Sequence, residues 1–380
     1  MKINIIYLII CLLTCLSCQN NYGDKLETSK SNAIDSLANR YLQLNRFSGT
    51  IVIVKDKATI YQRSFGFADY ENKIPFTNQT AFKIGEISDV ITNNILEGLI
   101  IEKQIDPADK LSKYLPNLKK GATIQDILKK ETEVDKNIKG KLIEGLSNNS
   151  YQKNLETYSA NLNLENTYFQ KKDTNSAVGY LYHNYRNKGL ELQRSPTYNL
   201  NEAYSSSGLK STGSDLIKIV NANPKELNIY GYLENDGFSY ALVNNLKDSI
   251  SIVVLSNRRH PVTKEITKST VAILKDEDYK LPLLRTPFPI DTSTLKNYTG
   301  AYSLNENVNF EVQKTKDSLF VVLGPNTVPL IPQSSNQFYM QHMDAAMKFL
   351  RDSKGIIDRV LLLNGFIDSD QIAYKNEYQN

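Results

Sequence analysis

The apolar pattern of this 380-residue chain changes once, at a proline-rich stretch between residues 281 and 290. Before that stretch, segments with helical spacing alternate with strand-like runs. After it, only short alternating runs follow, separated by Gly, Asn and Asp. Such a change of period indicates a change of fold class, and proline stiffens the links between domains. We therefore expect an α+β domain over residues 32–280, a linker over 281–290 and a small all-β barrel or sandwich over 291–380.

The first eighteen residues form a separate segment. Lys2 precedes an apolar run from Ile5 to Leu16, which is too short to span a bilayer comfortably and is typical of a signal peptide. The run ends in Leu16-Ser17-Cys18, which resembles the bacterial lipobox, whose last cysteine is lipidated. We therefore expect a signal peptide over residues 1–17 and a lipid anchor at Cys18.

The anchor defines the expected location of the chain. Residues 18–31 are polar and predict a short flexible tether, so the folded part would be attached to a membrane by acyl chains. This places the protein in the cell envelope of a bacterium, facing the periplasm or the cell surface. The alternative is an ordinary secretory signal that contains an incidental cysteine.

Composition excludes several functional classes. The chain has 45 Lys and Arg against 41 Asp and Glu, a formal net charge of +4, and no dense basic block, so nucleic-acid binding is not expected. All three cysteines lie within the first eighteen residues, which leaves the rest of the chain without a thiolate nucleophile or a cysteine metal site. We expect no metal and no other cofactor.

Hydrophobic spacing predicts the order of the first elements. Residues 32–44 have the pattern of an amphipathic helix. Two strand-like runs follow, Ile51–Val54 and Ile60–Gly66, and are expected to form a hairpin. Residues 82–101 are apolar at helical spacing and predict a long buried helix.

Short motifs follow one another in a fixed order along this first domain. They are Phe47-Ser48-Gly49-Thr50, Gly66-Phe67-Ala68-Asp69, Asn72-Lys73-Ile74-Pro75, Phe82-Lys83-Ile84-Gly85, Leu111 to Pro116, Ala122 to Leu128, Leu209 to Leu216 and Ile250 to Asn257. In that order they resemble the β-lactamase-related serine hydrolases, which include class C β-lactamases, D-alanyl-D-alanine peptidases and esterases. The resemblance covers about residues 47–275 and implies a β-lactamase/transpeptidase-like antiparallel sheet flanked by helices. Residues 298–302 resemble the start of the lipocalin-like β domain often appended to these hydrolases.

The same resemblance implies a nucleophile and a base at Ser-x-x-Lys on the first turn of the long helix, where the lysine takes the serine proton. In this chain the frame reads Glu86-Ile87-Ser88-Asp89, so Glu86 stands at the nucleophile position and Asp89 at the base position. Ser88 comes two residues later, about 200° around the helix from that face. The acylation chemistry of the family is therefore not expected here.

The two other family motifs are also missing from their expected places. The loop that carries Tyr-x-Asn is absent ahead of the helix near residue 141, which implies that part of the helical region has been lost. The strand near Tyr230 and Gly231 has no Lys or His where Lys-Thr-Gly or His-x-Gly would stand, although Gly231 matches the strand glycine. We expect Glu86, Asp89, Tyr230 and Gly231 to border the cleft, and we assign none of them as catalytic.

Three Ser-x-x-Lys strings occur elsewhere, at Ser150 with Lys153, Ser207 with Lys210 and Ser293 with Lys296. None follows the Phe-x-x-Gly sequence that precedes the motif in the family. Strings of this kind are expected by chance from the composition alone. We interpret all three as structural or surface residues.

Two functional classes remain. In the first, the protein is a non-catalytic lipoprotein whose hydrolase-shaped cleft binds a peptide, a glycan or a protein partner. In the second, it is a hydrolase of peptide, ester or cell-wall-type substrates, with Glu86 and Asp89 as a carboxylate pair whose pKa values are driven apart. The i,i+3 spacing without a third ligand favours the first class. Two carboxylates at a helix start are also stabilised by the helix dipole without any function.

Overall fold

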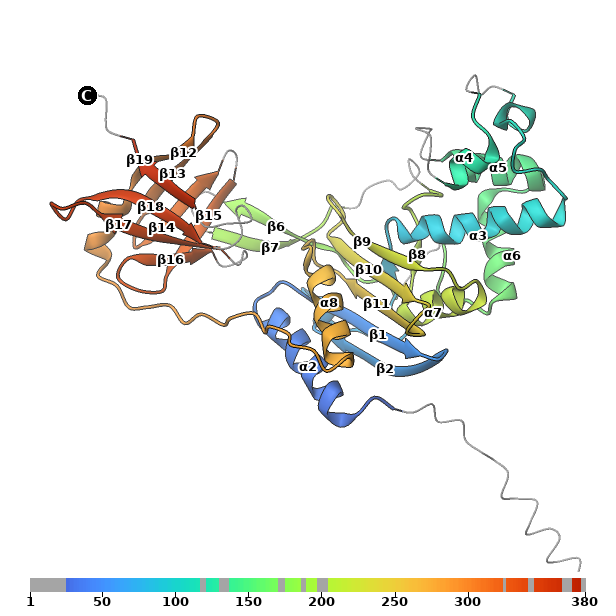
Figure 1. The fold of residues 1–380 in the computed structure, drawn as a ribbon, viewed down its shortest axis with the longest axis horizontal. Helices are drawn as coiled ribbons and strands as arrows, with labels where there is room; N and C mark the ends of the chain where they lie inside the picture. Colours follow the sequence, from blue (N-terminus) through green and yellow to red (C-terminus); the bar gives the residue numbers. More distant parts are fainter. Residues whose placement is uncertain are drawn as a thin grey trace, which may run out of the picture.

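The computed structural model describes residues 25–116, 121–129, 137–169, 175–185, 189–196, 204–323, 326–340, 345–363 and 371–376. A mixed α/β body is followed by a closed β-barrel (Figure 1). The predicted signal peptide and Cys18 lie outside these residues. Within them, no helix is both long enough and apolar enough to cross a membrane.

A five-stranded antiparallel sheet forms the centre of the body, in the order β2-β1-β11-β10-β9. Its strands are β1 (Gly49–Lys55), β2 (Ala58–Phe65), β9 (Leu227–Leu233), β10 (Phe238–Asn245) and β11 (Ile250–Ser256). β11 pairs with β1 on one side and β10 on the other, which joins the predicted N-terminal hairpin to strands almost 200 residues later. Ile252 to Leu255 are all fully buried because helices cover both faces of this central strand.

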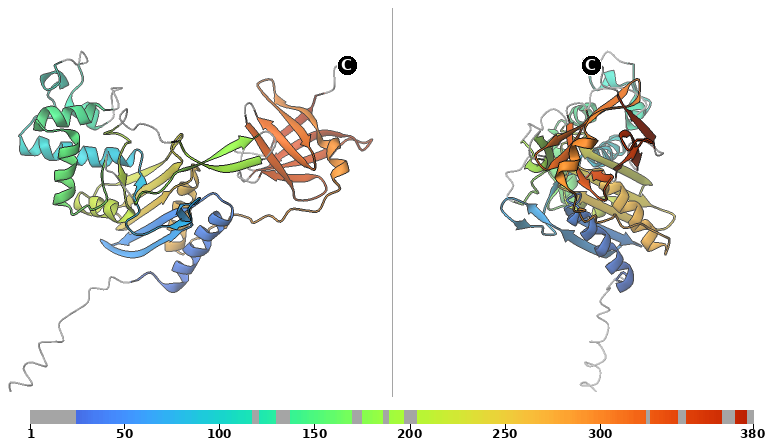
Figure 2. Two further views of the ribbon diagram at one scale, coloured as in Figure 1. Left: turned by 180° about the vertical axis from the view of Figure 1, so that it is seen from behind. Right: turned by 90° about the vertical axis from the view of Figure 1, so that its left-hand side faces the viewer.

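Helices cover the two faces of the sheet. α2 (Thr28–Gln43) and α8 (Val262–Leu274) pack on one face, where alternate residues of β1, Ile51 and Ile53, meet them. On the other face, Val52 and Val54 join a larger core cluster with α3 (Ile87–Glu102), α5 (Ile138–Ser147), α6 (Tyr151–Asn161) and α7 (Gly213–Ala222). The ribbon views show α2 and α8 together and the other helices on the opposite side (Figures 1 and 2).

Shorter elements connect these layers. They are β3 (Phe67–Asp69), β4 (Ile74–Pro75), β5 (Phe82–Lys83), η1 (Leu111–Lys113), α4 (Ile124–Leu128), β6 (Tyr180–Tyr185), β7 (Gly189–Arg194) and β8 (Lys210–Ser211). β5 pairs with β8 directly ahead of α3, so the start of the long helix is fixed by a sheet contact. β6 and β7 form a two-stranded ribbon that extends from the body to the barrel, where both strands contact β15 (Figure 2).

The C-terminal part is a closed antiparallel barrel of eight strands preceded by η3 (Thr292–Tyr298). The strands are β12 (Gly300–Asn305), β13 (Val308–Thr315), β14 (Ser318–Leu323), β15 (Asn326–Pro332), β16 (Gln337–Met340), β17 (Ala346–Arg351), β18 (Ile357–Leu363) and β19 (Gln371–Lys375). β19 pairs with β12 and closes the barrel, which leaves no free edge strand. Tyr298, Tyr302, Phe338 and Phe349 pack against one another in its core. The predicted α+β fold followed by an all-β barrel is confirmed.

The proline-rich linker is tied to a domain at each end. Arg40 of α2 donates to the carbonyl of Pro282 at 2.7 Å. At the other end the backbone amide of Phe288 donates to Pro332 at 2.8 Å, and the hydroxyl of Tyr339 donates to the carbonyl of Arg285 at 3.0 Å. The two halves of the linker thus belong to different packing units. Independent folding of the two domains remains a prediction.

Candidate functional site

The first turn of α3 is the position where the family resemblance implies the catalytic serine and lysine. Gly85 precedes the helix with a φ of 51°, and Glu86 is the N-cap residue. The side chain of Glu86 is exposed, whereas Ser88 and Asp89 are buried. The two carboxylates therefore lie in different environments, one in solvent and one inside the protein.

The side chain of Tyr240 from β10 fills the space beside Glu86. Its hydroxyl accepts a hydrogen bond from the backbone amide of Glu86 at 3.1 Å. A Cβ atom built on Gly85 would lie 2.2 Å from the Tyr240 ring, and one built on Gly231 would lie 2.4 Å from its hydroxyl oxygen. The two glycines thus hold the ring between the helix start and the edge strand β9. No larger residue fits at either position while Tyr240 is there.

Tyr240 keeps its proton in this position. Burial raises the pKa of the hydroxyl, and the nearby Glu86 carboxylate adds to that effect, although the hydrogen bond from the Glu86 amide opposes it. In serine hydrolases, backbone amides at the nucleophile are aimed at the oxyanion of the tetrahedral intermediate. Here the corresponding amide points at a neutral tyrosine hydroxyl. This contact cannot be inferred from sequence patterns, because 154 residues separate the partners.

Asp89 forms a buried ion pair with Lys139 of α5. The ammonium group lies 2.8 and 2.9 Å from the two carboxylate oxygens, and each residue is 8% exposed. The pair links α3 to α5. It places the Lys139 ammonium beside Asp89, which stands at the position that the resemblance assigns to the family's lysine. No sequence motif marks Lys139 as this partner. An aspartate within a buried helix requires a cationic or hydrogen-bonding partner, but the sequence does not say which lysine supplies it.

Ser88 lies on the buried side of α3. It is fully buried, and its hydroxyl oxygen accepts a hydrogen bond from the amide of Leu209 at 3.2 Å. One turn later, the Thr92 hydroxyl is 2.7 Å from the Tyr151 hydroxyl and donates to the Ser205 carbonyl at 2.5 Å. These contacts fasten the helix to the segments behind it. The geometry agrees with the view that Ser88 is not a nucleophile.

Tyr230 does not border this site, contrary to the prediction. Gly231 pairs with Tyr240 across the two strands and lies on the same face of the sheet as α3. Because consecutive strand residues point to opposite faces, Tyr230 packs against the cluster around α2 and α8. The Lys264 ammonium lies 5.6 Å from its ring centroid. Gly231 lies against Tyr240 near Glu86, whereas Tyr230, one residue earlier, is on the opposite face. That Gly231 borders a cleft stays a prediction.

A lysine on β5 lies near the end of β9. Lys83 of β5 forms an ion pair with Asp236, on the turn between β9 and β10, at 2.6 Å. Both side chains are mostly buried, with 13% and 16% exposed. The pair holds the end of β9 against the segment that leads into α3, so this lysine is already neutralised.

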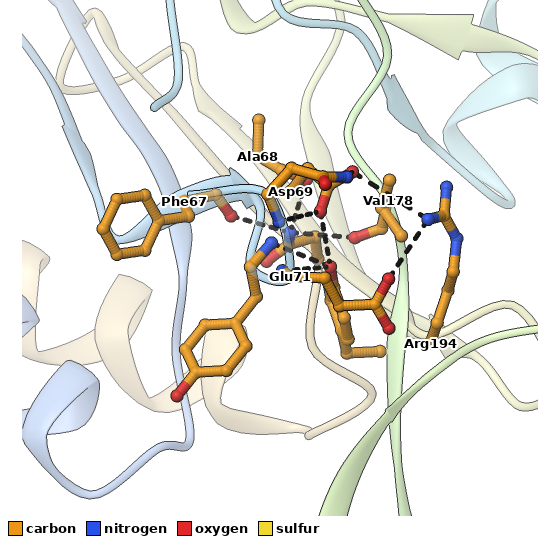
Figure 3. A network of polar contacts seen from close by, with 10 residues as sticks. Phe67, Ala68, Asp69, Glu71, Val178 and Arg194 are labelled. Carbon is orange, nitrogen blue, oxygen red and sulfur yellow. Dashed lines mark hydrogen bonds and ion pairs between the residues drawn. The ribbon is translucent and has the colours of Figure 1, made fainter. Parts of the chain in front are cut away.

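A polar network at the base of the β6–β7 ribbon involves Asp69, from the Gly66-Phe67-Ala68-Asp69 motif (Figure 3). Asp69 accepts hydrogen bonds from the amide and side chain of Asn72 at 3.0 and 2.8 Å and from the Tyr180 hydroxyl at 3.3 Å. Burial pushes the pKa of Asp69 upward, but these hydrogen bonds and the Arg194 guanidinium outweigh it and lower the pKa. Arg194 also binds Glu71 at 3.2 Å. The network ties β3 and the following turn to the ribbon.

Asn257 completes that network from the end of β11. Its side-chain amide lies within hydrogen-bond distance of three carbonyls, those of Phe67, Ala68 and Val178, at 3.0, 3.2 and 2.9 Å (Figure 3). Two of the motifs that carry the family resemblance therefore meet here, and their role is structural. In the described part of the chain, no group of three His, Cys, Asp or Glu residues could hold a metal ion.

Comparison with known proteins agrees with this fold. The β-lactamase family model matches residues 34–129, and the model of DUF3471, a domain of unknown function, matches residues 284–375. The body thus has a β-lactamase-like fold, and its residues 34–129 are similar to the β-lactamase family. The barrel lies within the segment that matches DUF3471.

Solved structures share the fold at low sequence identity. FmtA from Staphylococcus aureus is 19% identical with a TM-score of 0.54, over 69% of this chain and 91% of that protein. The octameric penicillin-binding protein homologue from Pyrococcus abyssi is 17% identical with a TM-score of 0.53, over 92% of this chain and 100% of the other. The D-amino acid amidase from Ochrobactrum anthropi SV3 is 14% identical with a TM-score of 0.54, over 66% and 99%.

Among curated proteins, the teichoic acid D-alanine hydrolase of Staphylococcus aureus is 34% identical over 77 residues. The match covers 20% of this chain and 19% of the hydrolase. The chain thus spans about one fifth of the length of the curated relatives it matches.

Proposed function

We propose that the protein is a non-catalytic, lipid-anchored member of the β-lactamase-like family, which binds a cell-envelope ligand without hydrolysing it. The observation that carries this proposal is the hydrogen bond from the Glu86 amide to the Tyr240 hydroxyl. An oxyanion would need that amide, and the amide is already bonded to the phenol oxygen.

The ion pair of Asp89 and Lys139 supports the same view. A lysine that acts as a base must have a nearby serine to deprotonate and must be able to lose its own proton. The buried carboxylate holds Lys139 through two short contacts, and the nearest serine of α3, Ser88, is engaged with Leu209. The pair therefore serves to hold α3 and α5 together.

The second class, a hydrolase that uses Glu86 and Asp89 as an acid–base pair, fits the geometry less well. Such a pair needs both carboxyl groups to face one substrate. Glu86 is exposed, whereas Asp89 is directed to Lys139 inside the protein. We therefore favour binding over this chemistry.

The relatives suggest which ligand to test first. One acts on teichoic acid D-alanine and another on D-amino acid amides, and both groups present a D-amino acyl unit. We propose that this chain binds a peptide or glycan of the cell envelope that carries such a unit. A lipid anchor at Cys18 would keep the protein next to these polymers.

The proposal is tested by calorimetric titration of the chain with an acetylated D-alanyl-D-alanine peptide, alongside an assay for released D-alanine. We expect saturable binding, weaker binding of the L-alanyl peptide, and no D-alanine above the buffer level. Release of D-alanine that disappears in Glu86→Gln or Asp89→Asn would contradict the proposal and favour the carboxylate pair.

A further inference from the structure

A serine, a lysine and a tyrosine meet outside the inherited catalytic position. The Lys210 ammonium donates to the Ser176 hydroxyl at 2.7 Å, and the Tyr168 hydroxyl lies 3.2 Å from the same oxygen. The ammonium also lies 5.9 Å from the centroid of the Tyr168 ring. The three groups thus form one compact cluster with the serine between the other two.

Backbone pairing holds the three residues in place. Lys210 of β8 pairs with Lys83 of β5, and it forms two backbone hydrogen bonds with Tyr168 at 3.0 and 2.9 Å. Ser176 forms an isolated parallel bridge with Ala81, directly ahead of β5. The small sheet that leads into α3 therefore fixes the backbone positions of all three residues relative to one another.

The cluster can be reached from solvent. Tyr168 is 7% exposed, whereas Ser176 and Lys210 are half-buried. The serine hydroxyl contacts the Lys210 ammonium and the Tyr168 phenol. Once the ammonium has lost its proton, the amine lies within proton-transfer distance of the serine as a base, and the phenol fixes the orientation of the hydroxyl.

We interpret the Ser-x-x-Lys string that contains Lys210 as structural, and its serine is not the one that Lys210 contacts. Lys210 belongs to the string Ser207-Gly208-Leu209-Lys210, but the structure pairs it with Ser176, 34 residues earlier. The pairing depends on the strand contacts around β8, which a short string cannot reveal.

We propose that Ser176 is a reactive nucleophile, with Lys210 as its base and Tyr168 as a positioning residue, and that it accepts acyl groups from activated esters. The unprotonated amine of Lys210 takes the serine proton while the serine oxygen bonds to the ester carbonyl carbon. The ester C–O bond then breaks, and the leaving alcohol takes the proton from Lys210. Water hydrolyses the acyl-serine and restores the hydroxyl.

Activated esters are the substrate class that the local backbone allows. The amide of Ala177 donates to Ala81, and the amide of Lys210 donates to Tyr168. Neither of these two amides is directed at an incoming oxyanion, so the leaving group has to be a good one. The inference goes beyond the proposed function, because no residue of the inherited centre takes part in it.

The test uses the purified chain and a fluorophosphonate probe, in which the serine oxygen bonds to phosphorus and fluoride leaves. We expect one covalent adduct, located on Ser176 by peptide mapping, and its loss in Ser176→Ala. Lys210→Arg keeps the positive charge but is a poor base, and it should slow labelling by about 10²-fold or more. Tyr168→Phe should slow it less, and Ser207→Ala is the matched control that should label like the wild type.

Circular dichroism checks that each variant is folded. If Ser176→Ala does not fold, two other measurements test the proposal. The first is peptide mapping of the wild type. The second is alkylation of Ser176→Cys by iodoacetamide, which should be faster when Lys210 is present than in the Lys210→Arg background. An unlabelled wild type, an adduct on another serine, or an unchanged rate in Lys210→Arg would overturn the proposal.

Discussion

The hydroxyl of Tyr240 accepts a hydrogen bond from the backbone amide of Glu86, and the ring is held between Gly85 and Gly231. This contact joins the start of α3 to β10, beside the edge strand β9. The amide of Glu86 is thus bonded to the protein itself, in a helix turn that lacks the serine and lysine of the family motif.

Removing the Tyr240 hydroxyl should weaken the fold without creating an enzyme. Tyr240→Phe leaves the Glu86 amide without its partner, so we expect the free energy of unfolding to fall by about 0.5–1.5 kcal/mol. Urea titration monitored by circular dichroism measures the change. Tyr232→Phe, at an exposed position on β9, is the control and should be neutral. Equal stability of both variants would show that the hydrogen bond contributes nothing.

The ion pair between Asp89 and Lys139 should be sensitive to the loss of one partner. Lys139→Met leaves a buried carboxylate uncompensated, and we expect a loss of about 3–5 kcal/mol in the free energy of unfolding. Replacing both residues, as in Asp89→Leu with Lys139→Met, should recover most of that loss. The pair of Lys113 and Asp109, whose side chains are 60% and 24% exposed, offers a control, since Lys113→Met should change stability little.

A double variant as unstable as Lys139→Met alone would contradict this account, because the cost would then lie in packing and not in the unpaired charge. The double-mutant cycle separates the two. Chemical denaturation of the wild type, Lys139→Met, Asp89→Leu and the double variant in the same buffer gives the coupling energy directly.

Asp69 should make stability depend on pH in the acid range. Its folded pKa is lowered, because hydrogen bonds from Asn72 and Tyr180 outweigh the effect of burial. A carboxylate with a lowered pKa stabilises the fold above its unfolded pKa of about 3.9, and this contribution is lost as the pH falls through the folded pKa. The stability difference between the wild type and Asp69→Asn should thus be full at pH 7 and shrink below about pH 4.

Urea titrations between pH 7 and pH 3 measure this difference. Asp278→Asn, at an exposed position, is the control and should follow the wild type throughout. A difference between wild type and Asp69→Asn that stays constant down to pH 3 would contradict the lowered pKa.

The lipid anchor at Cys18 can be tested in cells. Mass spectrometry of the mature N-terminus should show an acylated cysteine, and Cys18→Ala should move the protein from the membrane fraction to the soluble fraction. Cys11→Ala, within the apolar run, should leave the anchor intact. An unmodified mature protein in the soluble fraction would refute the lipoprotein assignment.

The linker should be the first point of proteolytic attack. Its ends are tied to α2 and to the barrel, whereas Leu283 and Leu284 between them are 62% and 48% exposed. We expect limited proteolysis to cut within residues 281–290 and to leave two folded fragments, identified by mass and by circular dichroism. Unfolding of either fragment after this cut would show that the domains depend on each other.

The fold was more predictable from the sequence than the site. Continuous β-branched runs such as Ile51–Val54 and the repeated short strands after residue 298 define the sheet and the barrel locally, because strand preference and turn residues are local properties. The contacts of Tyr240 with Glu86 and of Lys139 with Asp89 span 154 and 50 residues and depend on tertiary packing. Tyr230 was misplaced because a shift of one residue on a strand reverses the face.

The central claim, that the inherited catalytic centre is inactive, is tested most directly by incubating the purified chain with a fluorescent penicillin and mapping every modified peptide. An active penicillin-binding protein treated in parallel serves as the positive control. The account predicts no penicilloyl adduct anywhere in residues 82–102, while the control protein is fully labelled. A penicilloyl adduct on Ser88 that disappears in Ser88→Ala would contradict it.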